Sequence, residues 1–273
     1  LNIGSTFYFS ASDGGSGPDL WKSDGTTSGT VKIKDLSIWS ETAFVSIGTT
    51  LYFVTGPDYE LWKSDGTTSG TVLVKNIHST GNSFPGPFVV MNSKLYFSAY
   101  DGSNGRELWV SDGTSAGTTM LGDFASGSDS TFYGVSVEMV STGSLIFWEG
   151  LDSSSANGAL WVSDGTTSGT KILSTICTNC NPEMQNMIVH GSDVYFIGKT
   201  ILGEHMLWKS NGTTSGTKMF TDFANNQGHD VSGYCIMNDS NNEDILLFTA
   251  EEAYTGRELY YDRVTITDTT YTY

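Results

Sequence analysis

Apolar and polar residues alternate in short runs along the whole chain, and the same arrangement returns six times. In the most regular copy the apolar runs cover 88–91, 94–99, 107–111 and 118–123, with turn residues between them. Alternation over four to seven residues between turns rich in Gly, Asn and Asp is typical of half-buried strands joined as hairpins. The pattern predicts units of four antiparallel strands and no long helix.

The most repetitive part of each unit is a Leu-Trp strand followed by a turn. The stretch Leu20–Thr30 returns almost unchanged at 61–71, 108–118, 160–170 and 207–217. In such a turn the Asp carboxylate accepts backbone N–H groups just downstream, and Gly supplies a positive φ. We therefore interpret the repeated Asp-Gly-Thr turn as a structural element rather than a site of chemistry.

The units recur at roughly 40- to 50-residue intervals, which is typical of propeller blades or of solenoid repeats. We expect an all-β fold, a six-bladed β-propeller of four-stranded antiparallel blades that forms a single domain over 1–273, with Thr265–Tyr273 as the last strand. The expected blades are 1–38, 39–78, 79–125, 126–176, 177–224 and 225–273. A solenoid, and an array cut from a longer chain, are the alternatives.

The third copy, Glu107–Thr118, matches the motif Glu-Leu-Trp-x-x-Asp-Gly-Thr-x-x-Gly-Thr throughout. The chain thereby resembles the ELWxxDGT repeat family of secreted and surface proteins, and the resemblance covers essentially its whole length. The family implies a propeller-like fold and an extracellular setting, and it offers no catalytic residues to carry over. Three of the other four copies depart at the Glu position, so we expect this Glu to serve no shared activity; the residues there are Asp19, Glu60, Ala159 and Met206.

The net charge and the hydropathy of the chain exclude some classes of partner. The net charge is −17, and the 13 basic residues are scattered singly, so nucleic acid is not expected as a partner. No run of about 18 apolar residues occurs, so we expect no membrane span. The chain begins with neither Met nor a signal peptide, which we interpret as processing. With the acidity and the Ser/Thr-rich turns, this favours an extracellular or cell-surface location.

Cysteines and glycosylation sequons fit the same setting. Cys177 and Cys180 form a Cys-x-x-Cys pair, which can be a redox motif, half a zinc site or a small disulfide loop. No second pair completes a zinc site and no βαβ pattern surrounds the pair, so we expect a structural disulfide. Cys235 is expected to be a buried free thiol. Asn211 and Asn238 begin Asn-x-Ser/Thr sequons and are candidate glycosylation sites.

The connections between the second and third strands of the units vary in length and sequence, whereas the strands do not. This is typical of a binding surface, although drifted surface loops are the simpler alternative. An aromatic ring can stack on a sugar while carboxylates accept its hydroxyl protons, and each ring could instead pack its loop onto its own blade. The candidate contacts are Trp39, Tyr100, Asp101, Tyr133, Trp148, Glu149 and Tyr254.

Metal ligands are sparse. His78, His205 and His229 fall on connections at one face and could converge on a metal, but they lack local ligand spacing. Three solvated histidines are therefore the default interpretation. Oxygen-rich loops at Asp13 and Asp101 suit calcium better, although neither follows the EF-hand spacing. Calcium is the one cofactor that the composition favours.

Catalytic signatures such as Gly-x-Ser-x-Gly, His-Glu-x-x-His and the P-loop are absent from the sequence. We therefore expect a non-catalytic extracellular module that recognises a glycan or an extracellular protein. One alternative is a structural matrix or surface-assembly protein with calcium bridges, and homo-oligomerisation stays open. The other is a propeller hydrolase or lyase that uses paired carboxylates such as Glu251-Glu252.

Overall fold

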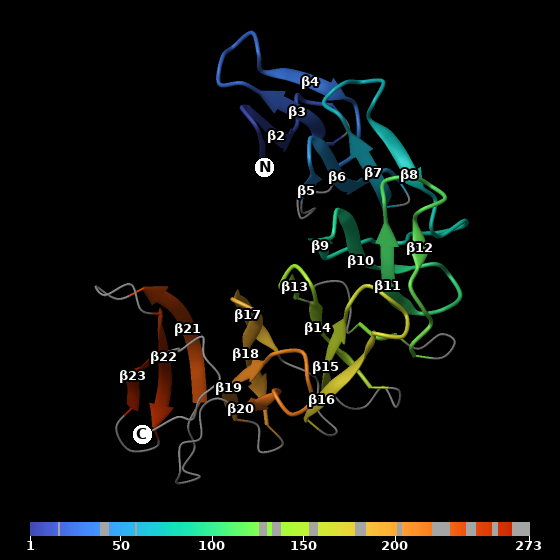
Figure 1. The fold of residues 1–273 in the computed structure, drawn as a ribbon. Helices are drawn as coiled ribbons and strands as arrows, with labels where there is room; N and C mark the ends of the chain where they lie inside the picture. The colour runs from blue at the N-terminus through green and yellow to red at the C-terminus, as the bar shows by residue number, and fades with distance from the viewer. Residues whose placement is uncertain are drawn as a thin grey trace. The chain divides into compact units, whose positions relative to one another are not determined.

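The computed structural model contains β-strands as its only regular secondary structure among the residues that it describes (Figure 1), which agrees with an all-β fold. The described residues are 1–15, 17–38, 44–57, 59–125, 130–132, 138–152, 158–177, 184–200, 204–219, 230–238, 244–252 and 256–263.

The strands form six antiparallel sheets that follow one another along the chain. The first sheet holds β1 (Asn2–Ile3), β2 (Thr6–Ala11), β3 (Asp19–Ser23) and β4 (Val31–Lys34). The second holds β5 (Val45–Ile47), β6 (Thr50–Thr55), β7 (Glu60–Ser64) and β8 (Val72–Lys75). The third holds β9 (Phe88–Met91), β10 (Lys94–Tyr100), β11 (Arg106–Ser111) and β12 (Thr119–Met120).

The remaining three sheets continue the series. The fourth holds β13 (Met139–Ser141), β14 (Ile146–Leu151), β15 (Gly158–Ser163) and β16 (Lys171–Cys177). The fifth holds β17 (Gln185–His190), β18 (Asp193–Lys199), β19 (His205–Ser210) and β20 (Lys218–Met219). The sixth holds β21 (Asp230–Asn238), β22 (Asp244–Glu252) and β23 (Gly256–Arg263). Five sheets thus have the expected four strands, and the expected last strand, Thr265–Tyr273, lies outside the described residues.

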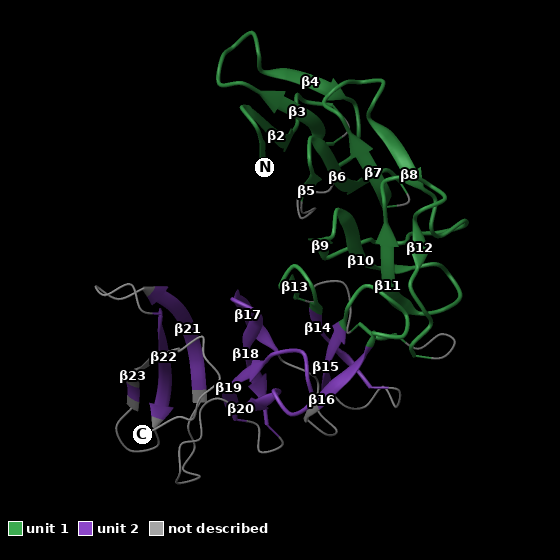
Figure 2. Cartoon of the chain, in the orientation of Figure 1, with its two compact units in different colours: residues 1–146, 163–170 green, residues 147–162, 171–273 purple. Residues whose placement is uncertain are grey.

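The chain divides into two compact units, coloured separately in Figure 2. Unit 1 comprises Leu1–Ile146 and Ser163–Thr170. Unit 2 comprises Phe147–Val162 and Lys171–Tyr273. The expectation of a single domain over the whole chain stays a prediction.

Within each sheet, the Leu-Trp strand pairs with the aromatic strand before it. In the third sheet Trp109 faces Phe97 across β11 and β10, and in the fifth sheet Trp208 faces Phe196. The Phe196 and Trp208 rings stack with centroids 6.3 Å apart. Such cross-strand aromatic pairs stabilise a sheet by about 0.2 to 1 kcal/mol each. The repeated Phe and Trp positions therefore set the register of each hairpin.

Neighbouring sheets pack through apolar faces. In unit 1 one core joins the first and second sheets, and another joins the second and third sheets; in unit 2 a core joins the fifth and sixth sheets. Each core draws buried side chains from both sheets, among them Leu61 of β7 and Phe97 of β10. Burying apolar surface stabilises a folded protein by about 25 cal/mol per Å². Each sheet therefore depends on its neighbour for part of its stability.

The Asp-Gly-Thr turns have the geometry expected from the sequence. Asp112 Oδ1 accepts the Thr114 N–H at 2.8 Å and the Thr114 hydroxyl at 2.7 Å, and Gly113 has a φ of 85°. The hydrogen bonds from the Thr side chain and backbone hold the pKa of this Asp below its ordinary value, as they do at Asp24 and Asp65. These contacts support a structural role for the turn.

In unit 1 the turn of one sheet also receives side chains from the sheet before it. Tyr52 of β6 lies against Gly113, and Lys63 of β7 donates to the Gly113 carbonyl at 2.8 Å. Tyr52 and Lys63 face each other across the two strands, so they act as a pair. Equivalent contacts are Tyr8 and Lys22 on Gly66, and Tyr96 on Gly165.

Candidate functional site

Carboxylates at the start of the third strand of a sheet bind the connection that leads to the next sheet. Glu60, the first residue of β7, is buried, and its carboxylate oxygens accept the backbone N–H of Ile77 at 2.9 Å and of His78 at 3.0 Å. Its Oε2 also accepts the Ser83 hydroxyl at 2.7 Å. In the first sheet Asp19 accepts the Leu36 N–H at 2.8 Å. This carboxylate position therefore anchors an inter-sheet connection.

Glu107 holds the same position in the third sheet with fewer partners. Its Oε2 accepts the Thr131 hydroxyl at 3.0 Å and the Phe124 N–H at 3.4 Å, while Oε1 is buried with no hydrogen-bond partner among the described residues. Burial raises the pKa of Glu107 from 4.5 to about 7, and the charge of Asp123 adds to the shift. A carboxyl that titrates near neutrality can serve proton transfer, but this one is fully enclosed.

In the fourth sheet the carboxylate that binds the following connection lies on the second strand instead of the third. Glu149 follows Phe147 by two residues, as Ala99 follows Phe97, and Ala159 stands where the third sheet has Glu107. Ala99 and Glu107 face each other across β10 and β11. The carboxylate and the alanine have therefore exchanged strands. Glu149 still binds the following connection, since its Oε1 accepts the Met184 N–H at 3.2 Å.

This arrangement corrects two predicted ligand contacts. We expect Trp148 and Glu149 on an exposed connection, but both lie in β14, and both are buried. Trp148 has no exposed surface and stacks on Trp161 with ring centroids 5.7 Å apart. β14 continues through Trp148 and Glu149 to Leu151, so both side chains pack within the sheet and not on a connection.

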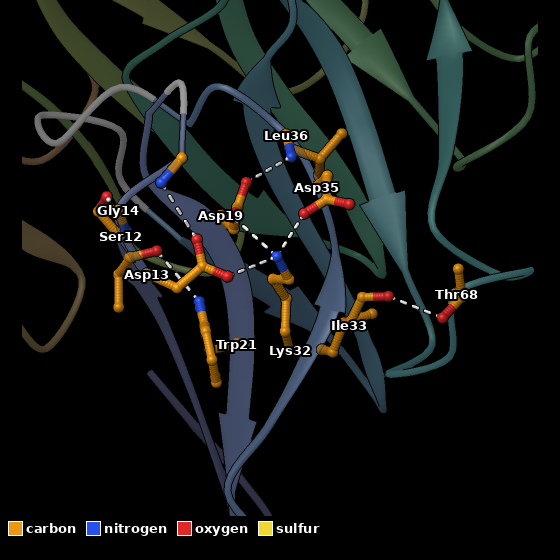
Figure 3. A network of polar contacts seen from close by, with 12 residues as sticks. Ser12, Asp13, Gly14, Asp19, Trp21, Lys32, Ile33, Asp35, Leu36 and Thr68 are labelled. Atoms are coloured by element: carbon orange, nitrogen blue, oxygen red, sulfur yellow. Dashed lines mark hydrogen bonds and ion pairs between the residues drawn. The ribbon is translucent and has the colours of Figure 1, made fainter.

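The charged cluster in Figure 3 joins three elements of the first sheet around one lysine. Lys32 Nζ lies 2.7 Å from Asp13, 2.5 Å from Asp35 and 3.5 Å from Asp19. The hydrogen bonds that Lys32 donates to Asp13 and Asp35 raise the pKa of Lys32, and the same lysine lowers the pKa of Asp13. The Lys32 ammonium therefore accounts for the lowered pKa of Asp13, and calcium binding at Asp13 stays a prediction.

A cavity of about 370 Å³ lies beside this cluster, where the first sheet meets the second. The indole of Trp62 forms part of its wall, and Lys34 Nζ lies 5.4 Å from the centre of that ring. Lys34 also donates to the Thr71 carbonyl at 2.7 Å. The lining residues are Asp35, Leu36, Ser37, Gly56, Pro57 and Trp62. Sequence reasoning misses this site, because Trp62 belongs to the repeated motif and gives no separate signal.

The third sheet brings three other predicted residues close together. Tyr100 ends β10 with 37% of its surface exposed, and its ring meets the His78 ring edge-on at 5.2 Å. Asp101 Oδ1 accepts the N–H of Ser103 and Asn104, and Oδ2 accepts the Asn104 side-chain amide. Burial alone would raise the pKa of Asp101, but these hydrogen bonds lower it. The Asp101 carboxylate therefore stabilises the conformation of its own loop.

The other predicted metal residues belong to different units. His205 begins β19 in unit 2, whereas His78 and Asp13 belong to unit 1. Within the described ranges, no group of three His, Cys, Asp or Glu side chains has the spacing to hold a metal ion. Four predicted residues lie outside the described residues: Trp39, Tyr133, His229 and Tyr254.

The cysteines and sequons have mixed outcomes. Cys235 is a free thiol, as expected, but it lies exposed on β21 rather than buried. Cys177 ends β16, and Cys180 lies outside the described residues, so their disulfide stays a prediction. Asn211 opens an exposed turn, and Asn238 ends β21. Glycosylation of both stays a prediction.

No helix in the described part of the chain has the length and apolar character needed to cross a membrane.

Comparison with known proteins gives fold relatives only. No protein-family model and no curated protein matches the chain. Among solved structures, a puromycin hydrolase matches 98% of this chain and 54% of its own at 11% identity, with a TM-score of 0.53. A puromycin-hydrolyzing peptidase from Mycobacterium tuberculosis matches 92% of this chain and 44% of its own at 8% identity, with a TM-score of 0.54. A prolyl endopeptidase matches 91% of this chain and 38% of its own at 10% identity, with a TM-score of 0.51.

These matches overturn our interpretation of the chain as a non-catalytic module that recognises a glycan or an extracellular protein. These three proteins, each of which matches more than nine-tenths of this chain, are hydrolases. The chain spans about half or less of their length. What is shown is a propeller-like, all-β fold.

Proposed function

We propose that this chain is a β-propeller domain of the hydrolase type that takes part in cleaving amide-linked substrates, such as aminoacyl compounds and peptides. The observation that carries the proposal is the likeness to the puromycin hydrolase over 98% of this chain. The two peptidase structures add support. We also propose that the six sheets form one closed six-bladed ring, and that the chain belongs to the ELWxxDGT repeat family.

The cavity beside Trp62 is the place that we assign to the substrate. Its volume of about 370 Å³ falls within the range of roughly 300 to 1,000 Å³ that small-molecule sites occupy. Trp62, Leu36 and Pro57 give it an apolar wall, which suits a substrate side chain. Asp35 is a lining residue whose carboxylate binds Lys32 through Oδ1, and its other oxygen suits a substrate amino group. The net charge of −17 favours approach of cationic substrates.

The test is hydrolysis by the purified chain, with puromycin and a panel of aminoacyl and prolyl nitroanilides as substrates. The released amine is measured by chromatography. Trp62→Ala should lower kcat/KM by roughly tenfold or more, because it removes the aromatic wall of the site. Trp21→Ala is the matched control, since Trp21 has the equivalent position in the first sheet but does not line the cavity.

Two outcomes would contradict the proposal. A folded chain that releases no amine from any of these substrates would refute the hydrolase function. Equal losses in Trp62→Ala and Trp21→Ala would show that the cavity is not the substrate site, because a general loss of packing would then explain both.

A further inference from the structure

The turn that carries Asn211 differs from its four counterparts by an amide in place of a carboxylate. Asn211 Oδ1 accepts the Thr213 N–H at 3.0 Å and the Thr213 hydroxyl at 2.7 Å. In the other four turns an Asp oxygen accepts the same two donors at 2.8 to 2.9 Å and 2.6 to 2.7 Å; these residues are Asp24, Asp65, Asp112 and Asp164. The turn is therefore built to hold a carboxylate.

Asn211 is also followed by the residue type whose backbone nitrogen is least hindered. The next residue, Gly212, has no side chain to hinder its nitrogen, and Asn211 itself is exposed. The Gly212 N–H is held by a long bond of 3.2 Å to Ser210 Oγ. The two Thr213 donors polarise the Asn211 amide, and they stabilise the negative charge that Oδ1 gains when Cγ is attacked.

We propose that Asn211 is a deamidation site whose product, an aspartate at position 211, occupies the turn as the four aspartates do. The Gly212 nitrogen gives its proton to water or hydroxide and bonds to Asn211 Cγ, and the Cγ–Nδ2 bond breaks as ammonia leaves with a proton. The product of this step is a cyclic imide. Water then adds to one of the two imide carbons. Addition at Cγ breaks its bond to the Gly212 nitrogen, which restores the main chain and leaves a carboxylate; addition at the main-chain carbon of residue 211 leaves an isoaspartyl linkage instead.

A second Asn-Gly pair in the described residues, Asn104-Gly105, provides the contrast. Asn104 Nδ2, the leaving nitrogen, donates to Asp101 Oδ2 at 2.7 Å. A carboxylate at position 104 would therefore face the Asp101 carboxylate, and like charges at this distance repel. Gly105 is buried, whereas the Asn211 turn is open to water. The fold protects Asn104 and exposes Asn211 to the same chemistry.

The change would have two effects on this face of the fifth sheet. It adds one negative charge where the hydrogen bonds already favour an ionised side chain, so the turn keeps its stability. It also removes the amide that glycosylation requires, because Asn211 begins the sequon Asn211-Gly212-Thr213. Deamidation and glycosylation at this position therefore exclude each other.

The experiment holds the folded chain at mildly alkaline pH and body temperature, then digests samples over several days and weighs the peptides. The peptide with Asn211 should lose ammonia roughly tenfold faster than the peptide with Asn104, because only Asn211 has both donors on its carbonyl oxygen. Thr213→Val removes the hydroxyl donor and should slow the reaction. Asn211→Asp should melt at the same temperature as the parent.

The same incubation in concentrated urea is the control for the fold. There Asn104 and Asn211 should react at similar rates, since the contacts that distinguish them are lost. Equal rates in the folded chain would overturn the proposal, and so would a rate difference that persists in urea. A melting temperature of Asn211→Asp several degrees below that of the parent would show that the turn does not accept the product.

Discussion

The side chain of Tyr52 lies directly against Gly113, so the turn of the third sheet has no room for a Cβ at that position. Gly25 has the same place in the first sheet and nearly the same φ, 89° against 85°. No described residue, however, comes within 4 Å of the place where its Cβ would lie. The two glycines therefore separate the cost of backbone strain from the cost of crowding between sheets.

Gly113→Ala should lower the free energy of unfolding more than Gly25→Ala does. Both variants force alanine into a positive φ, which costs about 1 to 3 kcal/mol. Only Gly113→Ala also displaces Tyr52 and the contact between sheets, which adds about 1 to 3 kcal/mol. Urea unfolding of the two variants measures the difference, and equal losses would show that the Tyr52 contact contributes nothing.

Glu107→Gln should flatten the pH dependence of stability. Burial raises the pKa of Glu107 from 4.5 to about 7, so the folded protein keeps a proton that the unfolded chain releases. The contribution of this carboxyl to the free energy of unfolding is therefore greatest below pH 4.5, and it falls by about 3 kcal/mol as the pH rises to 7. The variant should be the more stable protein above pH 7. Urea unfolding at a series of pH values measures this, and parallel curves for the two proteins would contradict it.

Lys32→Met should destabilise the first sheet in a salt-dependent way. Without the ammonium, the carboxylates of Asp13, Asp19 and Asp35 face one another without a cation, and they repel. Salt screens this repulsion, so the loss in melting temperature should shrink as salt is added. Lys22→Met is the control, because Lys22 donates to the neutral Gly66 carbonyl. A loss that does not change with salt would count against the charge cluster.

Asp112→Ala should lower the melting temperature by roughly 2 to 4 °C, whereas Asp112→Asn should change it little. Alanine removes the oxygen that accepts both Thr114 donors, and asparagine keeps it, as Asn211 does in the fifth sheet. Thermal unfolding followed by circular dichroism measures both variants. If the two melt together, the charge rather than the acceptor stabilises the turn.

The strands and turns could be predicted from the sequence because their signals are local. The expected run at 88–91 is β9, and the expected turn geometry at Gly113 is present. Each signal depends on residues a few positions apart, such as the aromatic pair before a Leu-Trp strand. The six-sheet, all-β arrangement follows from the repetition of these signals.

The site could be predicted less well, because its residues meet only after the chain has folded. Lys32 gathers carboxylates from a loop, a strand and a connection, and no spacing in the sequence marks that meeting. Trp148 and Glu149 are predicted on a connection, whereas β14 continues through both of them to Leu151. One signal was available: Ala159 lacks the carboxylate of its counterparts, and Glu149 supplies it from the neighbouring strand.

The contacts of Tyr52 and Lys63 with Gly113 run in one direction along unit 1, from one sheet to the turn of the next. Sheets coupled in this way share stability as a one-dimensional cooperative array, in which each member protects its successor. The turn of the first sheet receives no such cover from a described residue, and its Gly25 is exposed where Gly66 is buried. Local opening should therefore begin there, so the Gly25 amide should exchange its hydrogen for deuterium sooner than the Gly66 amide does.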